Sequence, residues 1–516
     1  MFMESIEFIK VDRDTPFLFP PSVQEWLPTD HLARFVADIV GQLNVSSLRD
    51  VYTGKGSMPY DPALLLSLLF YGYATGVFSS RKLEQATYDS VAFRYLVGNH
   101  HPDHDTISMF RKRFSTELKD LFNQILLIAH EMGILKLGTV SLDGTKVKAN
   151  ASKHQALSWE HAGKIAKQLQ EEVEQLWLLA DQADQSLIPD GMKIPEEIER
   201  RETRLAGIAK AKEKIEARAA ERYEQEKQAY ESKLAAREKK EKERGKKLGG
   251  KPPKPPEQGP KPHDQINLTD EESRIMPTSG GGFMQAFNAQ ACVDIASLLI
   301  VATHTTQQPN DKQQIEPALE ALANLPEQLG QVTELLADTG YYSQANVDAC
   351  ESAGISPMIA VSREEHHQSL ENRFTEPEPV SETADSVTKM RYRLKSKKGK
   401  AVYAKRKSTV EPVFGIIKSA LGYRQFLRRG IEEADAEWTL VSLAWNLKRM
   451  HVLAKPRPKK TVFAVCKAKS GAHRGQLPVF WHIQLFEMVQ LAKIFTMRTI
   501  ETIFATNRQF LSPTGC

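Results

Sequence analysis

The sequence has few cysteines, no marked excess of charge of one sign and no export signal at its start. Its 4 cysteines include no close pair, which excludes zinc-knuckle spacing and is typical of a reducing cytosol, so we expect a cytoplasmic protein. The opening segment MFMESIEFIKVDRD lacks the basic-then-apolar pattern of a signal peptide. An apolar run over residues 479–497 is interrupted by Glu487 and Lys493, which favours a buried or interfacial helix over a membrane span.

The bulk charge is also uninformative. A net charge of +4 over 516 residues does not identify a nucleic-acid-binding protein, so only the clustering of charge carries information. A chain of this length is expected to form roughly two to four domains.

Residues 1–137 have apolar residues at helical spacing and predict an all-α N-terminal domain. We expect helices over residues 30–43, with Asp30 as N-cap, and over residues 61–76, 79–89 and 105–133. Basic residues in the early turns of the last two helices suit DNA binding by a helix–turn–helix. A charged face turned to solvent explains them equally well. These basic residues are Arg81, Lys82, Arg111, Lys112 and Arg113.

Two later segments predict an interrupted α/β domain. Residues 138–152 alternate as a first strand. Residues 280–453 then supply two strands, a helix, a strand, a helix and a last strand. The tail, residues 454–516, fits neither segment and is given no role.

The insertion between these segments, residues 153–279, has a different composition. Between Glu196 and Lys254 there are 19 Lys and Arg against 13 Asp and Glu. Apolar residues recur there at helical or near-heptad spacing, which predicts a helical hairpin or coiled coil. A Pro/Lys-rich linker, KLGGKPPKPPEQGPKPHD, ends the insertion.

Three carboxylates in different local settings are the candidate catalytic groups. Asp143 lies in the first strand, where Asp-Gly also fits a hairpin turn. Asp338 follows a short apolar strand, where open α/β sheets place ligands and where a turn or capping aspartate is equally common. Acids placed on the strands and on a late helix of one domain are what a metal-dependent phosphoryl-transfer site requires.

The third acid, Glu411, precedes Pro412 near a helix start, beside a stretch (residues 389–407) that holds ten Lys and Arg and no acid. Ser408 and Glu411 fit a capping box, but Pro412 argues for a later helix start that frees Glu411. A continuous helix would align Glu411 with Gly415, Lys418 and Gly422 and place Lys418 near a DNA phosphate.

Several segments together resemble the DDE transposases of bacterial insertion sequences, over about residues 17–453. They are HPDHDTISMFRKRF, VSLDGTKVKANASKH, MQAFNAQACVD, QPNDKQQIEPAL, LADTGYYS and YAKRKSTVEPVFGIIKSALGYRQFLRRG. The resemblance implies an RNase H-like mixed sheet flanked by helices, in which Asp143, Asp338 and Glu411 bind metal. A long helical insertion between the first two acids fits one branch of this family.

The family signature of tyrosine, arginine, glutamate and lysine is matched by Tyr403, Glu411 and Lys418. Lys407 holds the slot of the arginine and Arg406 precedes it, so which of the two contacts DNA stays open. The resemblance implies double-stranded DNA as partner, both element ends and target, bound by a homodimer on paired ends.

The expected chemistry uses two Mg²⁺ ions, for which Mn²⁺ can substitute, because hard oxygen ligands suit these ions better than zinc. Water would be activated to cleave the element end, and the freed 3′-OH would then attack target DNA. Three alternatives remain: a related nuclease without strand transfer, an inactive DNA-binding descendant, and a coiled-coil scaffold. His100, His101 and His104 suggest zinc, but no cysteine lies near them.

Overall fold

The computed structural model describes residues 22–52, 58–183, 193–246, 249, 251–278, 280–362, 377–381 and 384–455. These residues belong to a compact unit that ends at Pro456. The predicted tail therefore lies outside the described residues from Pro456 onward, as does the apolar run within it.

The first part of the chain is helical. Its elements are η1 (Val23–Glu25), α1 (Leu32–Gln42), α2 (Ser46–Asp50), α3 (Pro62–Thr75), α4 (Ser80–Asp89), α5 (Val91–Leu96), α6 (His104–Arg113) and α7 (Leu118–Glu131). The α3 boundaries follow from capping: the Asp61 side chain accepts the Ala63 N–H at 2.7 Å, and Gly76 closes the helix at φ 85°. The α1 cap is His31, whose Nδ1 accepts the Ala33 N–H, so the expected Asp30 cap was wrong.

The helix expected over residues 105–133 is two helices. Helix α6 begins earlier, because Asp103 caps the Thr106 N–H at 2.6 Å, and it ends at Arg113. The Ser115 hydroxyl then donates to the Lys112 carbonyl at 3.2 Å. Hydroxyl side chains compete in this way with the backbone for hydrogen bonds, which accounts for the break before α7.

A six-stranded mixed sheet forms the centre of the α/β part. Its strands are β1 (Thr139–Lys148), β4 (Arg274–Pro277), β5 (Phe283–Asp294), β6 (Ile300–Thr306), β7 (Glu334–Ala337) and β8 (Ser356–Ile359). The order is β4-β5-β1-β7-β8, with β6 also paired to β5. Strand β1 runs antiparallel to β5 and parallel to β7.

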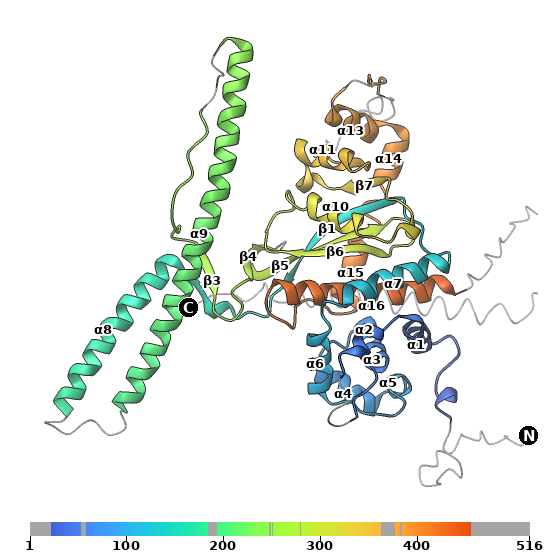
Figure 1. Ribbon diagram of the computed structural model, residues 1–516, viewed down its shortest axis with the longest axis horizontal. Helices are drawn as coiled ribbons and strands as arrows, with labels where there is room; N and C mark the ends of the chain where they lie inside the picture. The colour runs from blue at the N-terminus through green and yellow to red at the C-terminus, as the bar shows by residue number, and fades with distance from the viewer. Residues whose placement is uncertain are drawn as a thin grey trace, which may run out of the picture. The chain divides into compact units, whose positions relative to one another are not determined.

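Helices cover the sheet on both sides. They are α10 (Ile315–Ala323), α11 (Gln344–Ser352), α13 (Ser386–Lys395), α14 (Lys397–Tyr403), α15 (Val410–Gly415) and α16 (Ile431–Ala454), with the short turns η3 (Glu327–Leu329), η4 (Thr339–Tyr341) and η5 (Ile416–Ala420). Figure 1 shows α10 and α11 on one side of the sheet and α7 and α16 on the other. The mixed α/β class is confirmed. From β5 to β8 the order of strands and helices is as predicted, whereas β4, α13 and α14 were not predicted. The arrangement is consistent with an RNase H-like domain.

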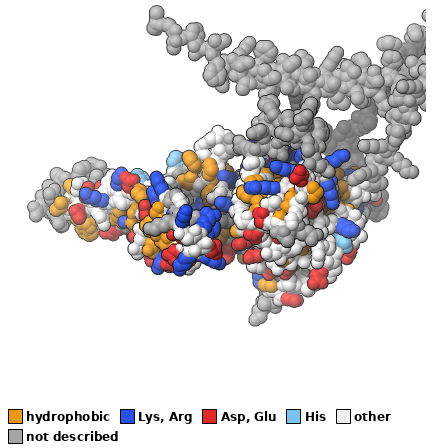
Figure 2. All heavy atoms as spheres, turned by 90° about the horizontal axis from the view of Figure 1, so that it is seen from above, with side chains coloured by type: hydrophobic (Ala, Val, Ile, Leu, Met, Phe, Trp, Pro, Cys, Tyr) orange, Lys and Arg blue, Asp and Glu red, His pale blue; other side chains and the backbone are white. Residues whose placement is uncertain are grey.

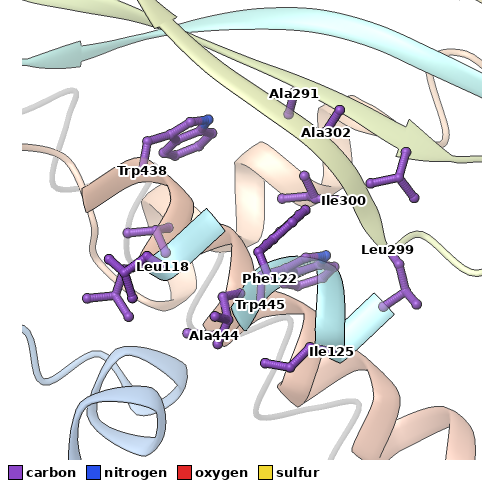
Figure 3. Packing of buried hydrophobic residues seen from close by; sticks show 14 of the residues in the cluster. Leu118, Phe122, Ile125, Ala291, Leu299, Ile300, Ala302, Trp438, Ala444 and Trp445 are labelled. Carbon is purple, nitrogen blue, oxygen red and sulfur yellow. The ribbon is translucent and has the colours of Figure 1, made fainter. Parts of the chain in front are cut away.

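One hydrophobic core joins the N-terminal helices to the central sheet and to α16, and the helices of the insertion lie outside it. In Figure 3, Trp445 of α16 lies beside Phe122 of α7 and near Ile300 of β6, while Trp438 lies apart from them on the same helix. Both indoles are also anchored by hydrogen bonds, Trp438 Nε1 to the Gln290 carbonyl and Trp445 Nε1 to the Leu298 carbonyl, each at 2.9 Å. The domain boundaries drawn from the sequence stay predictions, because the core crosses the one at residue 137.

The insertion is a helical hairpin of α8 (Trp159–Ala183) and α9 (Ile194–Arg244). At its root η2 (Lys153–Gln155) leads into a small sheet of β2 (Ala156–Ser158) and β3 (Gln265–Asn267). Among the described residues no single helix is long and apolar enough to cross a membrane. The bent pair α3 and α4 reaches that length and apolar composition only when the two helices are taken together.

Candidate active site

Asp143 lies in the middle of β1. The strand continues unbroken from Thr139 to Lys148 and pairs with β5 throughout, with Asp143 opposite Ala291. The hairpin-turn interpretation was therefore wrong. Asp143 is held in place by β5 from beyond the insertion, because its own strand and its partner are separated in sequence by α8 and α9.

Asp338 comes one residue after β7, next to Asp143. The parallel register pairs Ser141 with Leu336, so a step of two residues on both strands brings Asp143 and Asp338 level and onto the same face. The Asp338 carboxylate accepts the Gly340 N–H at 2.8 Å and caps η4. The capping role is thus real, and it leaves the second carboxylate oxygen for other contacts.

Glu411 reaches the same place from α15. The helix begins at Val410, so Pro412 falls in its first turn, as the later helix start required. Between Glu411 and Asp143 lies Arg406, a residue that is only 9% exposed. Its Nη1 is 3.6 Å from Asp143 Oδ2, and its Nη2 is 3.6 Å from Glu411 Oε1. One buried guanidinium therefore faces the first and third acids together.

Burial dominates the electrostatics of Asp143. Loss of solvent raises the pKa of its carboxyl to about 7, the Gly144 N–H lowers it, and the negative charges of Asp338 and Asp311 raise it further against the opposing effect of Arg406. A carboxyl that resists ionisation among other acids favours a bound cation.

Asp311 is a fourth acid of this site that sequence analysis did not single out. Its Oδ1 accepts hydrogen bonds from Asn288 Nδ2 at 2.8 Å and Gln290 Nε2 at 2.7 Å. A methyl group built on Gly144 would meet Asp311 Oδ1 at 2.7 Å, and one on Gly340 would meet Asp311 Oδ2 at 3.8 Å. Asp311 thus lies between the backbones that carry Asp143 and Asp338.

A signal for Asp311 was present in the sequence of β5. Asn288 and Gln290 are 1% and 0% exposed, in the middle of a buried strand whose neighbouring residues there are apolar. Buried amides require partners, so two of them at alternate positions predict a polar group facing that strand. The Tyr341 hydroxyl satisfies the remaining oxygen of Gln290 at 2.5 Å.

The helix that carries Glu411 does not continue as expected. After Gly415 it widens into a π-helical turn, η5, and Gly422 lies beyond it at φ 79°. The predicted alignment of Glu411 with Lys418 and Gly422 along one regular helix was therefore wrong. The Lys418 ammonium instead donates to the Lys146 carbonyl of β1 at 2.7 Å, and burial lowers its pKa to about 8.

The other residues of the signature have distinct positions. The Tyr403 hydroxyl donates to the Ala337 carbonyl at 3.1 Å, directly before Asp338. Lys407 is exposed, whereas Arg406 is turned inward to the acids. The structure thus brings Tyr403 and Arg406 to the acids and leaves Lys407 at the surface.

The basic residues of the N-terminal helices differ in their exposure to solvent. Arg81, Lys82 and Lys112 are exposed. Arg113 is exposed, with its guanidinium over the Tyr52 ring. Arg111 instead donates inward to the Tyr73 hydroxyl at 2.9 Å and the Phe78 carbonyl at 3.1 Å, and this placement does not support its predicted contact with DNA.

The histidines at the entrance of α6 have other partners. His104 Nδ1 lies 2.7 Å from Glu84, and His101 stacks on Tyr88. Within the described ranges, no three His, Cys, Asp or Glu side chains are grouped closely enough to hold a metal ion as they stand. At the candidate active site the donors still fit a hard divalent ion, since they are carboxylate oxygens that already face one cation, Arg406.

Two family models match the chain. One, described as a transposase domain (DUF772), matches residues 21–113, and the other, described as a transposase DDE domain, matches residues 256–447. The second match contains Asp311, Asp338 and Glu411, while Asp143 lies in the segment between the two matches. No curated protein and no solved structure matches the chain. The two matches together cover more than half of the chain, and they show that it belongs to the DDE transposases of insertion sequences.

Proposed function

We propose that this transposase cleaves DNA at the ends of its element and joins them to target DNA by metal-dependent phosphoryl transfer, with Asp143, Asp338 and Glu411 as its catalytic acids. The observation that supports the proposal is that three separate elements carry these acids toward the neighbourhood of Asp143. β1 and β7 bring the two aspartates level, and α15 brings Glu411 to the guanidinium that Asp143 also faces.

Transposases with a DDE domain generally use divalent metal ions. Asp143, Asp338 and Glu411 would hold them, and Mg²⁺ suits an all-oxygen donor set, with Mn²⁺ as a substitute. When bound, such ions activate the attacking oxygen and stabilise charge on the leaving oxygen.

The protein's own groups position this chemistry. Tyr403 fixes the end of β7, and hence Asp338, through the Ala337 carbonyl. Arg406 balances the charge of Asp143 and Glu411 and supplies a cation where phosphate must enter. We assign Asp311 to the same site as a positioning residue, because its hydrogen bonds to Asn288 and Gln290 hold its loop against β5, where Gln290 lies opposite Gly144, the neighbour of Asp143.

DNA binding follows from the family, and we propose its contacts residue by residue. Arg81, Lys82, Lys112 and Lys407 are exposed, which supports our proposal that they contact phosphates. Lys418 would reach DNA only by giving up its bond to the Lys146 carbonyl. Two element ends must react in concert, so we propose a homodimer on paired ends.

The test is cleavage of labelled duplex DNA that carries the flanking element ends, in Mg²⁺ and in EDTA, with the wild-type protein and Asp338→Asn. Metal-dependent nicking at the end, lost in the variant, is the expected result. Binding without cleavage in both Mg²⁺ and Mn²⁺ would show an inactive DNA-binding protein instead. Nicking without joining to target DNA would show a nuclease that lacks strand transfer.

A further inference from the structure

We propose that the end of α9, which extends past the start of α8 and away from the turn of the hairpin (Figure 1), is an arm that grips duplex DNA by its phosphates. The arm consists of residues 233–254, the end of α9 and the segment that follows it. Residues 159–232, the rest of the hairpin, are called the base. The inference rests on the proposed function, which brings duplex DNA to this protein.

Charge divides the hairpin sharply. The arm contains 10 Lys and Arg against 3 Asp and Glu, a net charge of +7. The base contains 12 Lys and Arg against 17 Asp and Glu, a net charge of −5. The hairpin and arm together, residues 159–254, hold 22 Lys and Arg against 20 Asp and Glu, so their near balance conceals two regions of opposite sign.

The base has a structural use for its residues. It contains two hydrophobic clusters, one around Ile208 and Ile215 and one around Leu176 and Ile198. Its surface charges form pairs of opposite sign one helical turn apart, as Lys164 does with Glu160 at 2.7 Å. Such pairs stabilise an exposed helix.

The arm makes little use of such contacts, although within it Arg237 Nε pairs with Glu241 Oε1 at 3.1 Å. The last buried residue among those described on α9 is Ala219, so the described residues of the arm on this helix contribute no buried side chain. A helix that is polar on every side is explained by ion pairs or by a partner. With only 3 acids, the arm has too few anions to pair its 10 cations.

The described residues of the arm nevertheless lie in two adjacent segments, the end of α9 and the proline-rich segment beside it. The proline-rich segment runs back along α9 (Figure 1), and Arg237 Nη1 donates to the Lys251 carbonyl at 3.3 Å. Within the base, Arg222 Nη2 donates to the Gly259 carbonyl of the same segment at 3.2 Å. Proline-rich backbone is extended and semi-rigid, so the exposed Lys251 and Lys254 are held beside the helix instead of moving freely.

The dimensions suit a duplex. Residues 233–244 of α9 span about 18 Å, while DNA carries one phosphate charge per ~1.7 Å of its axis. Viewed from above, Lys and Arg side chains gather near the middle of the hairpin's lobe, where α9 rises toward the viewer (Figure 2). Lysines on long flexible stems recognise phosphate charge without reading base sequence, so the arm contributes affinity and not sequence specificity.

The test lowers the net charge of the arm from +7 to +3 in the full-length protein. Lys239, Lys240, Lys242 and Lys246 are exposed, and all four are changed to Gln, which has nearly the helix propensity of Lys. Binding to a fluorescent random-sequence duplex of about 40 base pairs is measured in EDTA at several salt concentrations. We expect at least ~10-fold weaker binding near 0.1 M salt and a salt slope smaller by about 3 to 4.

The control removes the same charge from the base. Lys164, Lys167, Lys210 and Lys227 are also exposed, and their change to Gln is expected to alter affinity by less than about 2-fold. An unchanged salt slope in the arm variant would overturn the inference, and so would equal losses in the two variants. Failure of the wild-type protein to bind the duplex would count against both the inference and the proposed function. Wild-type protein that binds the duplex but does not cleave element ends would count against the proposed function alone.

Discussion

Residues 389–407 and the arm, residues 233–254, each contain ten Lys and Arg, yet their cations have different surroundings. The first stretch is folded onto the sheet: Tyr403 bonds to the end of β7, and Arg406 is buried against Asp143 and Glu411. The second is exposed along a helix that buries nothing there among its described residues. An equal number of cations therefore does not mean equal function.

The difference teaches that burial decides what a cation does. A buried guanidinium must be matched by carboxylates, so Arg406 belongs to the electrostatics of the acids. An exposed lysine is screened by water and salt, so it acts mainly by adding to attraction for a polyanion. We expect the first stretch to govern chemistry and the arm to govern affinity.

The largest expected effect is on DNA cleavage, when a catalytic acid is changed beside the buried Arg406. Asp143→Asn keeps the size of the side chain and removes the charge that a divalent ion requires, so end cleavage should fall by about 1,000-fold or more. Duplex binding in EDTA should change little. Glu327→Gln, an exposed acid of the same domain, is the control. Retention of cleavage by Asp143→Asn would remove Asp143 from the site.

The next effect compares two neighbours in the first basic stretch. Arg406→Gln leaves Asp143 and Glu411 without their shared cation, so the free energy of unfolding without metal should fall by about 1–3 kcal/mol. Lys407→Gln, at the surface, should change it by less than about 0.5 kcal/mol. Denaturant unfolding in EDTA measures both. Equal effects would show that the inward position of Arg406 has no energetic consequence.

A smaller effect is expected at Asp311. Asp311→Asn keeps an acceptor for Asn288 and Gln290 but removes a negative charge near Asp143. The Mg²⁺ concentration for half-maximal cleavage should rise about 3- to 10-fold, because the site attracts a divalent cation less strongly. The metal-free protein should be equally or more stable, since like-charge repulsion is relieved. A loss of stability with an unchanged Mg²⁺ midpoint would make Asp311 purely structural.

The smallest effect would test the other side of the contrast. Neutralising Lys239, Lys240, Lys242 and Lys246 should leave the free energy of unfolding within about 0.5 kcal/mol of wild type, because these side chains are exposed. Thermal and denaturant unfolding check this alongside the binding measurements. Marked destabilisation would show that the arm supports the fold, and the contrast with residues 389–407 would then fail.

Much of the fold was predictable because its signals are local. Alternation placed β1 and β5, and Asp61, Pro62 and Gly76 marked the ends of α3 as expected. The misjudged elements depended on competition between neighbours: His31 replaced Asp30 as a cap, and a serine hydroxyl helped to divide α6 from α7. Such competitions are settled by small energies that a sequence pattern does not rank.

The candidate site was predictable in its acids and less so in its surroundings. Asp143, Asp338 and Glu411 could be proposed because each follows a local pattern of strand or helix. Asp311 could not be ranked above other loop acids, because its partners on β5 come together with it only in the folded sheet. Arg111 and Lys112 are adjacent in sequence, yet one points into the core and the other to solvent.

The sequence by itself determined the order of elements, the three acids, the basic stretches and the interruption by a helical hairpin, because these depend on residue type and periodicity along the chain. Only the tertiary structure decided that Arg406 rather than Lys407 faces the acids, that Lys418 bonds to β1, and that the hairpin's positive charge lies at one end of it. The reason is physical: which atoms share a low-dielectric site is fixed by the packing of distant segments, and packing is a property of the whole fold.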